Sequence, residues 1–509
     1  MLRTARSGTS ATDFGKDRED DGTSDRDRPW YVRGNGTIER SCTVAHGTDR
    51  YLLPERPIES IDEYLATDVG GLGLQHAIDI GPDDTIALLT RAGLRGRGGA
   101  GFPTGTKWAS VRSQPESRRF AVCNGAEGEP GTFKDRALLR TNPYQVVEGL
   151  LTAAFVVDAE RAYIALKESF EEERARVTRA IIEMQDAGIC RDCEIVVVAG
   201  PDEYLYGEEK ALLEVIEGNP PLPRVLPPYQ HGLFATAPQL GWSSVPASGG
   251  VDRSRGDGSN PTLVNNVETL ANVPHILVHG ADWFRGHGTD ETPGNVVCTV
   301  VGDVVRPAVD EVEPGTSLRD VITAVSGGPR PGRSIKAVFS GVTNPVVRGE
   351  KLDVQLSYEG LASAGSGMGA CGFIVYDDTT CMVEVAAVFS NFLFVESCGQ
   401  CPPCKLGSAE ITLRLDDLQR GDATELRVEE IWEWLAKVTD GSRCFLATEE
   451  AQLVGSIIEQ FPREVEEHLL VDGCPRPRHL VVPKLVDLRD GEAVYDERQA
   501  RKRPDWTYD

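Results

Sequence analysis

The chain has 509 residues, which is too long for one hydrophobic core, so we expect about three domains. Its formal net charge of −26 argues against nucleic-acid binding, because phosphate contacts need a basic surface; such acidity is typical of a halophile's solvated surface or of an ordinary acidic enzyme. No apolar run reaches the roughly 18–20 residues that cross a bilayer and the polar N-terminus is unlike a signal peptide, so we expect a cytoplasmic protein, peripheral on a membrane complex at most.

Residues 1–58 are rich in Asp, Arg, Gly and Thr, which predicts a polar, disordered extension. Residues 59–290 predict an α/β domain with a largely parallel sheet, because short apolar strands alternate with helical patterns. The expected strands are FAVCN (120–124), AYIALK (162–167) and EIVVVAG (194–200). The expected helices include PDDTIALLTRAG (82–93), LLRTNPYQVVEGLLTAAFVV (138–157) and GEEKALLEVIEG (207–218).

The rest of the chain changes composition twice. Residues 291–380 show strands, a turn and a helix, the pattern of a small ubiquitin-like (SLBB-type) α+β domain. Residues 381–475 predict a C-terminal helical iron–sulfur domain around a cysteine cluster, and 476–509 a polar tail. Within the first domain, the Pro-, Gly- and Ser-rich stretch 221–262 is expected to be an exposed insertion.

The segment GLRGRGGAGFPTG (93–105) contains G-x-G-x-x-G, the spelling of a dinucleotide-binding turn. In a Rossmann unit these glycines follow a buried strand and open a helix. Here a helix precedes them, and Pro103 and Gly105 prevent a helix from starting at the third glycine, so the standard interpretation fails. A bare loop beside Arg97 and Lys107 suits a flat or phosphorylated ligand, with a structural turn as the alternative.

Three further segments place polar groups in turns. CNGAEGEPGTFKDR (123–136) holds Glu127 and Glu129 two residues apart, which suits ribose or ribityl hydroxyls or a general acid–base pair. YLYGEEKALL (204–213) has acids at a strand-to-helix junction, where N–H groups can face a ligand. PTLVNNVETLANV (261–273) has two asparagines before a helix, either as ligand contacts or as N-caps.

The chain has twelve cysteines, and without a secretory signal we expect metal or redox use rather than a disulfide framework. A C-x2-C-x2-C motif and one distant residue supply four thiols: Cys398, Cys401, Cys404 and Cys444. Four thiolates suit a [4Fe-4S] cluster, with structural zinc or unligated redox thiols as alternatives. The eight histidines show no metal-ligand spacing, and Cys381 and Cys474 are expected to be ordinary packing or surface thiols.

Together these motifs resemble the FMN- and NADH-binding subunit of respiratory complex I and its relatives in NAD-reducing hydrogenases and NAD-dependent formate dehydrogenases. The resembling stretches are GLRGRGGAGFPTGTKW, CNGAEGEPGTFKDRALL, YGEEKALLEVIEG, NPTLVNNVETLANV and FVESCGQCPPCKLG, in the family's order over about 60–470. The resemblance implies an NADH dehydrogenase that takes hydride from NADH onto FMN. It also implies that a [4Fe-4S] cluster on the cysteine motif receives single electrons and passes them to a partner subunit.

The resemblance also implies individual site residues. Around FMN it places Gly96, Arg97, Gly98, Lys107, Asn124, Gly207, Glu208, Val264, Asn265, Asn266 and Thr269. Around NADH it places Phe102, Glu129, Tyr204, Glu209 and Tyr229, with Phe102 stacked on adenine and Glu129 beside the nicotinamide. We take Glu127 as a further cofactor-binding residue, Glu129 and Glu209 as the catalytic residues, and the four thiols as the cluster ligands.

Three positions depart from the family pattern. Ala126 stands where an aspartate lies near the flavin, Leu226 where a lysine is usual, with Arg224 close by, and Ser110 where an aromatic often contacts adenine. A second hypothesis is therefore an FMN/[4Fe-4S] electron-transfer subunit of another oxidoreductase complex that does not use NADH. As partners the family implies a smaller [2Fe-2S] thioredoxin-like subunit and further electron-transfer subunits.

Overall fold

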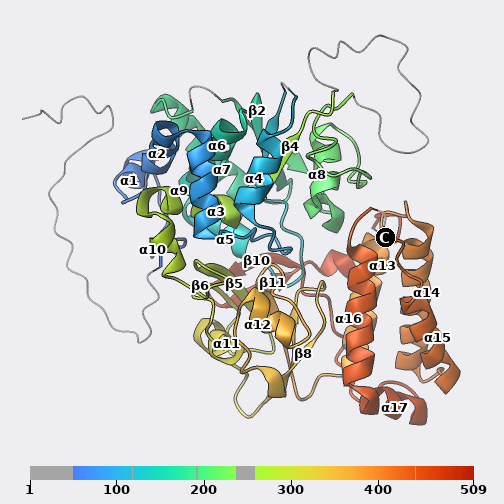
Figure 1. Cartoon of the computed structure of the whole chain (residues 1–509). Helices are drawn as coiled ribbons and strands as arrows, with labels where there is room; N and C mark the ends of the chain where they lie inside the picture. The colour runs from blue at the N-terminus through green and yellow to red at the C-terminus, as the bar shows by residue number, and fades with distance from the viewer. Residues whose placement is uncertain (1–49, 117, 191–192, 237–257, 442, 509) are drawn as a thin grey trace, which may run out of the picture. The chain divides into compact units, whose positions relative to one another are not determined.

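A computed structural model describes residues 50–116, 118–190, 193–236, 258–441 and 443–508 (Figure 1). Most of the expected extension over 1–58, and part of the expected insertion over 221–262, lie outside the described residues. The end of that extension is folded. Leu52 is fully buried, and the backbone N–H groups of Tyr51, Leu52 and Leu53 donate to the carboxylate of Glu311.

A four-stranded parallel sheet confirms the predicted α/β architecture. Its strands are β1 (Phe120–Asn124), β2 (Arg161–Lys167), β3 (Ile195–Gly200) and β4 (Thr262–Asn266), in the spatial order β3-β2-β1-β4. The order reverses beside β1, because β2 and β3 lie on one side of it and β4 on the other. In open α/β sheets, such a reversal leaves a crevice at the carboxyl ends of the strands, where ligands bind.

Helices surround this sheet: α1 (Ile61–Leu65), α2 (Leu72–Ile80), α3 (Pro82–Ala92), α4 (Thr104–Arg112), α5 (Lys134–Thr141), α6 (Pro143–Val157), α7 (Glu171–Asp186), α8 (Glu209–Ile216), α9 (Val267–His279) and α10 (Ala281–Arg285), with the short 3-10 helix η1 (Tyr204–Gly207) before α8. The single helix expected over 138–157 is two, α5 and α6. Asn142 caps α6 by accepting the N–H of Gln145. Pro143 begins α6, because its ring and missing N–H fit only the first turn of a helix.

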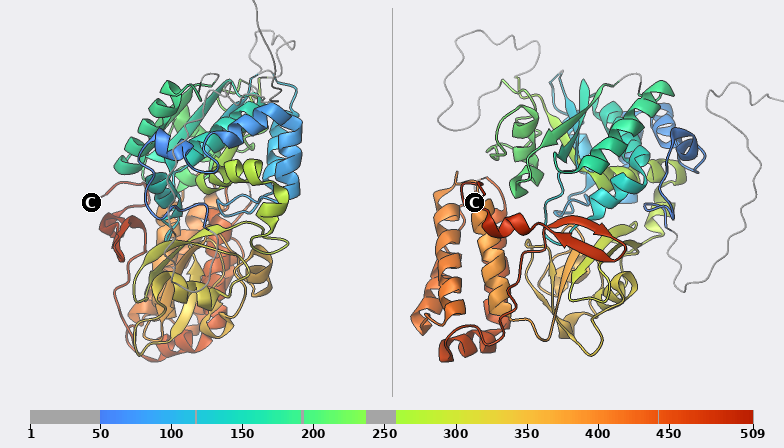
Figure 2. Two further views of the ribbon diagram at one scale, coloured as in Figure 1. Left: turned by 90° about the vertical axis from the view of Figure 1, so that its left-hand side faces the viewer. Right: turned by 180° about the vertical axis from the view of Figure 1, so that it is seen from behind.

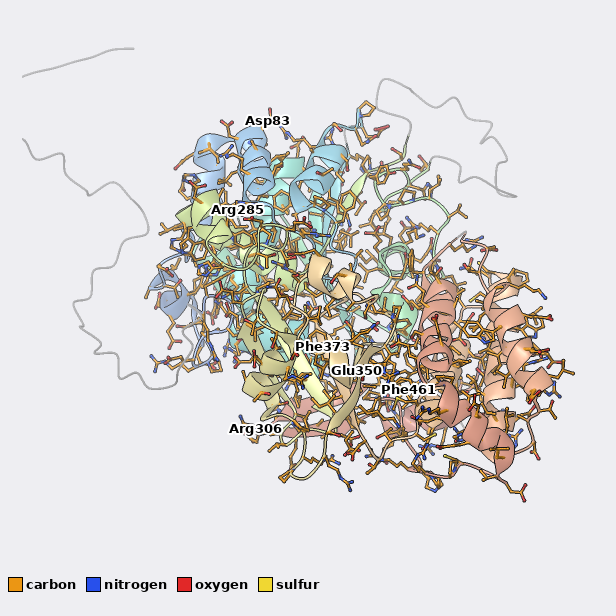
Figure 3. The ribbon with its side chains drawn as sticks, turned by 60° about the horizontal axis from the view of Figure 1, so that its bottom comes forward. Asp83, Arg285, Arg306, Glu350, Phe373 and Phe461 are labelled. Carbon is orange, nitrogen blue, oxygen red and sulfur yellow. The ribbon has the colours of Figure 1, made fainter. Side chains whose placement is uncertain are left out.

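A five-stranded mixed sheet follows, with the order β6-β5-β9-β7-β8. Its elements are β5 (Val296–Gly302), β6 (Ala308–Val312), α11 (Leu318–Ser326), β7 (Ile335–Ser340), β8 (Val347–Arg348), η3 (Gly349–Lys351), α12 (Tyr358–Ser363) and β9 (Gly372–Asp377). Its own hydrophobic core includes Ile322 of α11 and Phe373 of β9, the second of which Figure 3 labels. This is the α+β composition expected over 291–380, and the ubiquitin-like topology stays a prediction.

The following region is helical, as expected over 381–475. Its helices are α13 (Met382–Glu396), α14 (Pro402–Arg420), α15 (Glu425–Leu435), α16 (Leu446–Gln460) and α17 (Pro462–Leu470), drawn in orange and red in Figure 1. Phe461, labelled in Figure 3, joins α16 to α17 and lies under Lys336 and Arg348 of the neighbouring sheet. Across the described parts of the chain, no helix combines the length and apolarity needed to span a membrane.

The polar tail expected over 476–509 folds back onto the rest of the chain. It forms the antiparallel hairpin β10 (Leu485–Arg489) and β11 (Glu492–Tyr495), which Figure 2 shows from behind, and the 3-10 helix η4 (Glu497–Arg501). Arg140 of α5 donates to Asp487 of the hairpin (2.7 Å). The Lys502 ammonium contacts the Glu396 carboxylate at 2.9 Å, and both side chains are fully buried. The tail therefore braces α5 and the end of α13.

Candidate functional site

A cavity of about 630 Å³ opens at the carboxyl ends of β1 and β4, where the strand order reverses. Small-molecule sites commonly measure about 300–1,000 Å³. Its lining combines the glycine loop, both strand ends and the start of α8 with residues from two loops beside the five-stranded sheet and from α16. All three folded regions of the chain therefore contribute to one site.

The glycine loop, residues 93–103, forms one wall. It follows α3 rather than a strand, so it is not a Rossmann turn, although α4 does begin just after it. Gly99 (φ +125°) and Gly101 (φ +62°) adopt backbone conformations that other residues rarely adopt. A Cβ on Gly101 would lie 2.6 Å from the ring of Tyr358, whose hydroxyl donates to the Gly96 carbonyl (2.9 Å). Packing against α12 therefore requires glycine at position 101, while the neighbouring glycines face the cavity.

Three asparagines at the strand ends are held by internal hydrogen bonds. Asn124 donates to the Gly207 carbonyl (2.8 Å), which joins β1 to η1. Asn265 accepts the indole N–H of Trp108 (2.8 Å). Asn266, opposite Asn124 in the register, caps α9 by accepting a backbone N–H of its first turn (3.0 Å). These bonds fix the side chains before any ligand binds.

Most residues predicted to bind cofactor or substrate line this cavity: Gly96, Gly98, Phe102, Lys107, Asn124, Glu127, Glu129, Tyr204, Gly207, Glu208, Glu209, Val264, Asn265, Asn266 and Thr269. Two do not. Tyr229 is exposed outside the lining, where Gln230 donates to its hydroxyl. Arg97 is buried, with its guanidinium donating to the Pro293 carbonyl (2.6 Å) and its backbone N–H to Thr269 (2.8 Å). Arg97 therefore lies outside the lining, and its Nε and Nη1 have no hydrogen-bond partner among the described residues.

The charge of the cavity depends on burial. Lys107 pairs with Glu209 at 2.7 Å, and both side chains are partly exposed. Lys107 is the only Lys or Arg among the described residues that line the cavity, against several carboxylates. Burial raises the pKa of Glu127 and of Glu208 to about 7. Because both acids are partly protonated at neutral pH, the cavity repels an anionic group less than its number of carboxyl groups suggests.

A half-buried carboxylate, Glu129, joins the three folded regions. It accepts the Tyr204 hydroxyl (2.6 Å), the Val342 N–H (2.6 Å) and the Thr343 hydroxyl (2.8 Å). The Tyr204 hydroxyl also lies 3.2 Å from Glu449 of α16, and burial raises the pKa of Glu449 to about 8. The sequence analysis missed Glu449, because no local motif distinguishes it from any other acid on a helix.

A second group that sequence reasoning missed lies behind Asn266. Lys134 is fully buried and contacts Asp135 (2.7 Å) and Glu268 (2.8 Å). Asp135 in turn accepts the amide of Asn266 (2.6 Å) and lines the cavity. Lys134 and Asp135 lie in the segment 123–136, which the sequence analysis selected for its glutamates. Their position in that segment was the signal that could have identified them as site residues.

The four predicted cluster ligands, Cys398, Cys401, Cys404 and Cys444, line a second, small cavity at the start of α14. No three of their Sγ atoms lie within 4.8 Å of one another in the described chain. A single zinc ion would draw four thiolates to about 3.8 Å from each other, because each Zn–S bond is about 2.3 Å. Four thiols on the wall of one cavity suit a four-iron cluster, in which each thiolate binds a different iron.

The two cavities share a wall. Leu205, Cys444 and Leu446 line both of them. Cys444 therefore faces the thiol cavity on one side and the larger cavity on the other. This places the fourth thiol of the cluster motif beside the predicted flavin site.

Comparison with known proteins gives two family models that match separate regions. The Nuo51 FMN-binding domain matches residues 89–275, and the NADH-ubiquinone oxidoreductase-F iron–sulfur binding region matches residues 384–468. The two matches contain the larger cavity's strands and the four cysteines, respectively.

Full-length relatives are also similar. The F 2 component of NADH-quinone oxidoreductase from Rhizobium meliloti is 36% identical, over 77% of this chain and 90% of that protein. The HndC component of the NADP-reducing hydrogenase from Solidesulfovibrio fructosivorans is 34% identical, over 82% of each. Among solved structures, an NAD⁺-reducing [NiFe]-hydrogenase in the H2-reduced state is similar with a TM-score of 0.69 and 31% identity, over 81% of this chain and 67% of that chain.

Proposed function

The chain belongs to the family of the F component of NADH-quinone oxidoreductase, and from this premise we propose that it is the electron-input flavoprotein of an oxidoreductase complex. As an NADH dehydrogenase, it takes hydride from NADH onto FMN and passes single electrons to a [4Fe-4S] cluster and on to a partner subunit. The observation that carries this function is the wall shared by the two cavities, in which Cys444 takes part. That wall gives electrons a short route from the nucleotide site to the thiols.

The larger cavity fits FMN. A Cβ on Gly98 would lie 3.2 Å from the Cβ of Asn266, a tight contact, so a glycine favours the close approach of the loop to the end of β4. Bound FMN supplies a ring that accepts hydride and returns the electrons singly. The bare loop backbone and the fixed asparagines would hold it. Lys107 and the partly protonated Glu208 would accommodate its phosphate.

The thiol cavity fits a [4Fe-4S] cluster. Its thiols already have hydrogen-bond partners, since Ser397 lies 3.2 Å from the Cys404 sulfur and Gln400 donates to the Cys398 sulfur (3.6 Å). The cluster supplies a one-electron acceptor, and hydrogen bonds to its sulfurs tune its potential.

We assign NADH to the open side of the larger cavity. Phe102 is half exposed there and offers a face for adenine. Tyr204 holds the Glu129 carboxylate beside the expected nicotinamide position. Hydride transfer forms no bond to the protein, so Glu129 and Glu209 act by orienting the substrate rather than as nucleophiles.

The departures from the family pattern motivate the alternative function, an FMN/[4Fe-4S] subunit that does not use NADH. Ala126 is fully buried beneath the cavity and carries no carboxylate. Arg224 does not replace the cation missing at Leu226, because it is buried in ion pairs with Glu214 and Glu217 (both 2.5 Å). Relatives at 34–36% identity are named for NADH and NADP reactions, which favours nicotinamide use here.

We further propose that the chain works inside a complex at the cytoplasmic side of a membrane or in the cytoplasm. Its partners would be a smaller [2Fe-2S] thioredoxin-like subunit and further electron-transfer subunits. Support comes from the relatives, which are named as subunits of quinone oxidoreductases and hydrogenases.

The test is an anaerobic titration. The full chain, reconstituted with FMN, iron and sulfide, is mixed with NADH, and we expect the flavin absorbance to bleach. NADPH in a parallel titration identifies the preferred nicotinamide. Reduction by dithionite without bleaching by either nucleotide would overturn the NADH function and support the rival electron-transfer function.

A further inference from the structure

A second group of metal-ligand side chains lies away from both cavities. Cys381 precedes α13, His468 lies in the last turn of α17, and Cys474 lies in the segment after α17. Their ligand atoms, two Sγ and one imidazole nitrogen, all lie within 4.8 Å of one another. The sequence analysis expected these cysteines to be ordinary packing or surface thiols, and it found no metal-ligand spacing among the histidines. The three are distant in sequence, which is why spacing did not reveal them.

The geometry of this group matches a single tetrahedral ion. The Cys381 sulfur lies 3.5 Å from Nε2 of His468. With Zn–S bonds of about 2.3 Å and Zn–N bonds of about 2.0 Å, tetrahedral ligands stand about 3.5 Å apart. Nδ1 of His468 lies 2.6 Å from the Glu464 carbonyl, which assigns its proton to Nδ1 and leaves the Nε2 lone pair facing the sulfurs. Metal-binding histidines are commonly oriented in this way.

We propose that Cys381, His468 and Cys474 bind one structural Zn²⁺ ion. Binding would release the two thiol protons, and the two thiolates would balance the charge of the ion. Solvent or the exposed His479, five residues after Cys474, would complete the tetrahedron. Both cysteines are free thiols in the structure. A Cys381–Cys474 disulfide is the rival, but it would leave the aligned imidazole nitrogen without a partner.

The ion would fasten the C-terminal segment to the helical region. Glu464 of α17 accepts the N–H of Met382 (2.9 Å), so α17 already contacts the start of α13 beside the site. Residues 471–484 then lead to the hairpin that binds α5. The other end of α13 leads into the Cys398 motif, about 22 Å away for a 15-residue helix. The proposed zinc thus holds α13 at the end opposite the cluster.

The test measures zinc and iron in the full chain, purified anaerobically and desalted, by mass spectrometry of the metals. We expect one zinc per chain in addition to the cluster iron. Cys474→Ser and His468→Gln should each lower zinc at least fivefold while iron stays unchanged. Cys193→Ser, which changes a thiol outside the group, is the matched control and should retain zinc. Absorption spectroscopy at the zinc edge should report sulfur and nitrogen ligands together.

Three outcomes would overturn the proposal: unmodified protein without zinc, variants that retain it, or a Cys381–Cys474 disulfide found by alkylation under anaerobic conditions. If a variant folds poorly, removal of zinc from the unmodified protein by a chelator decides instead. The unfolding temperature should then fall, and added Zn²⁺ should restore it. Neither readout depends on NADH, so the inference stands or fails separately from the proposed function.

Discussion

In the thiol cavity, three of the four predicted ligands come from the short motif Cys398–Cys404, whereas the larger cavity takes its lining from segments between Gly96 and Gln452. The first site needs one local turn at the start of α14 and a single distant thiol. The second exists only when the parallel sheet, the mixed sheet and α16 are assembled. A change in the first should therefore stay local, while a change in the second should spread to several regions.

The largest expected effect is loss of the cluster. Cys401→Ala removes one of four thiolates, and the reduced-state paramagnetic signal should disappear, because the cluster needs one thiolate for each iron. FMN content should stay unchanged, since Cys401 does not line the larger cavity. Electron paramagnetic resonance of the dithionite-reduced protein and fluorescence of released FMN measure the two quantities. An unchanged signal would refute the ligand assignment, and a joint loss of FMN would refute the independence of the two sites.

The same contrast explains how much could be predicted from the sequence. The C-x2-C-x2-C motif predicted, without tertiary information, thiols that line one small cavity, and the asparagines at residues 265 and 266 predicted the start of the helix α9. Short apolar runs predicted β1, β2 and β3 of the parallel sheet, whereas β4 was not predicted as a strand. The break between α5 and α6 was also readable, since Pro143 favours a helix start.

The remainder depended on tertiary packing. Glu449 enters the cavity only because α16 packs beside η1, and Tyr358 reaches the glycine loop only because α12 does. The position of Arg97 also depends on packing, since its Nη2 donates to the Pro293 carbonyl. The Cys381 and His468 pair likewise requires the ends of α13 and α17 to meet. None of these contacts could be predicted from a hydrophobic period or from the spacing of residues in the sequence.

Glu129→Gln should give the next largest effect. The carboxylate accepts three donors, and the amide of glutamine turns one of them into a donor–donor contact. Loss of a hydrogen bond to a charged group costs about 2 kcal/mol, so kcat/KM for NADH should fall about 30-fold. Steady-state assays with a soluble acceptor measure it.

Glu209→Gln is the matched comparison for that variant. It breaks only the partly exposed contact with Lys107, and such pairs contribute less than about 1 kcal/mol. We expect a reduction of less than about fivefold. Equal effects for the two variants would mean that the three hydrogen bonds of Glu129 have no special role in binding NADH.

The helical region carries its own buried acid, Glu450, whose pKa is raised to about 8 by burial and which accepts the Ser390 hydroxyl (2.6 Å). Between roughly pH 4.5 and pH 8 the folded chain holds a proton that the unfolded chain releases. The free energy of unfolding therefore decreases as pH rises through this window. Glu450→Gln removes this dependence. The difference in free energy of unfolding between the variant and the unmodified protein should therefore grow by on the order of 2 kcal/mol, in favour of the variant, from about pH 6 to about pH 9.

The free energy of unfolding, measured at these two pH values, tests this difference. Glu459→Gln, which changes an exposed residue on the same helix, is the control. A gain that is equal for both variants would place the titrating group elsewhere. Because Glu450 lines neither cavity, NADH kinetics should stay unchanged, which separates the stability of the helical region from the chemistry of the flavin site.

A small effect should also come from the contact between α12, which follows the strand β8, and the glycine loop. Tyr358→Phe keeps the ring against Gly101 and under Arg95 but removes the bond to the Gly96 carbonyl. A single hydrogen bond contributes about 1 kcal/mol, so the dissociation constant of FMN should rise about fivefold. Titration of the deflavinated protein with FMN measures it, and Tyr163→Phe, a buried tyrosine outside the lining, should leave it unchanged. If the loop holds its conformation without α12, Tyr358→Phe will match that control, and the larger cavity will depend on fewer regions than its lining indicates.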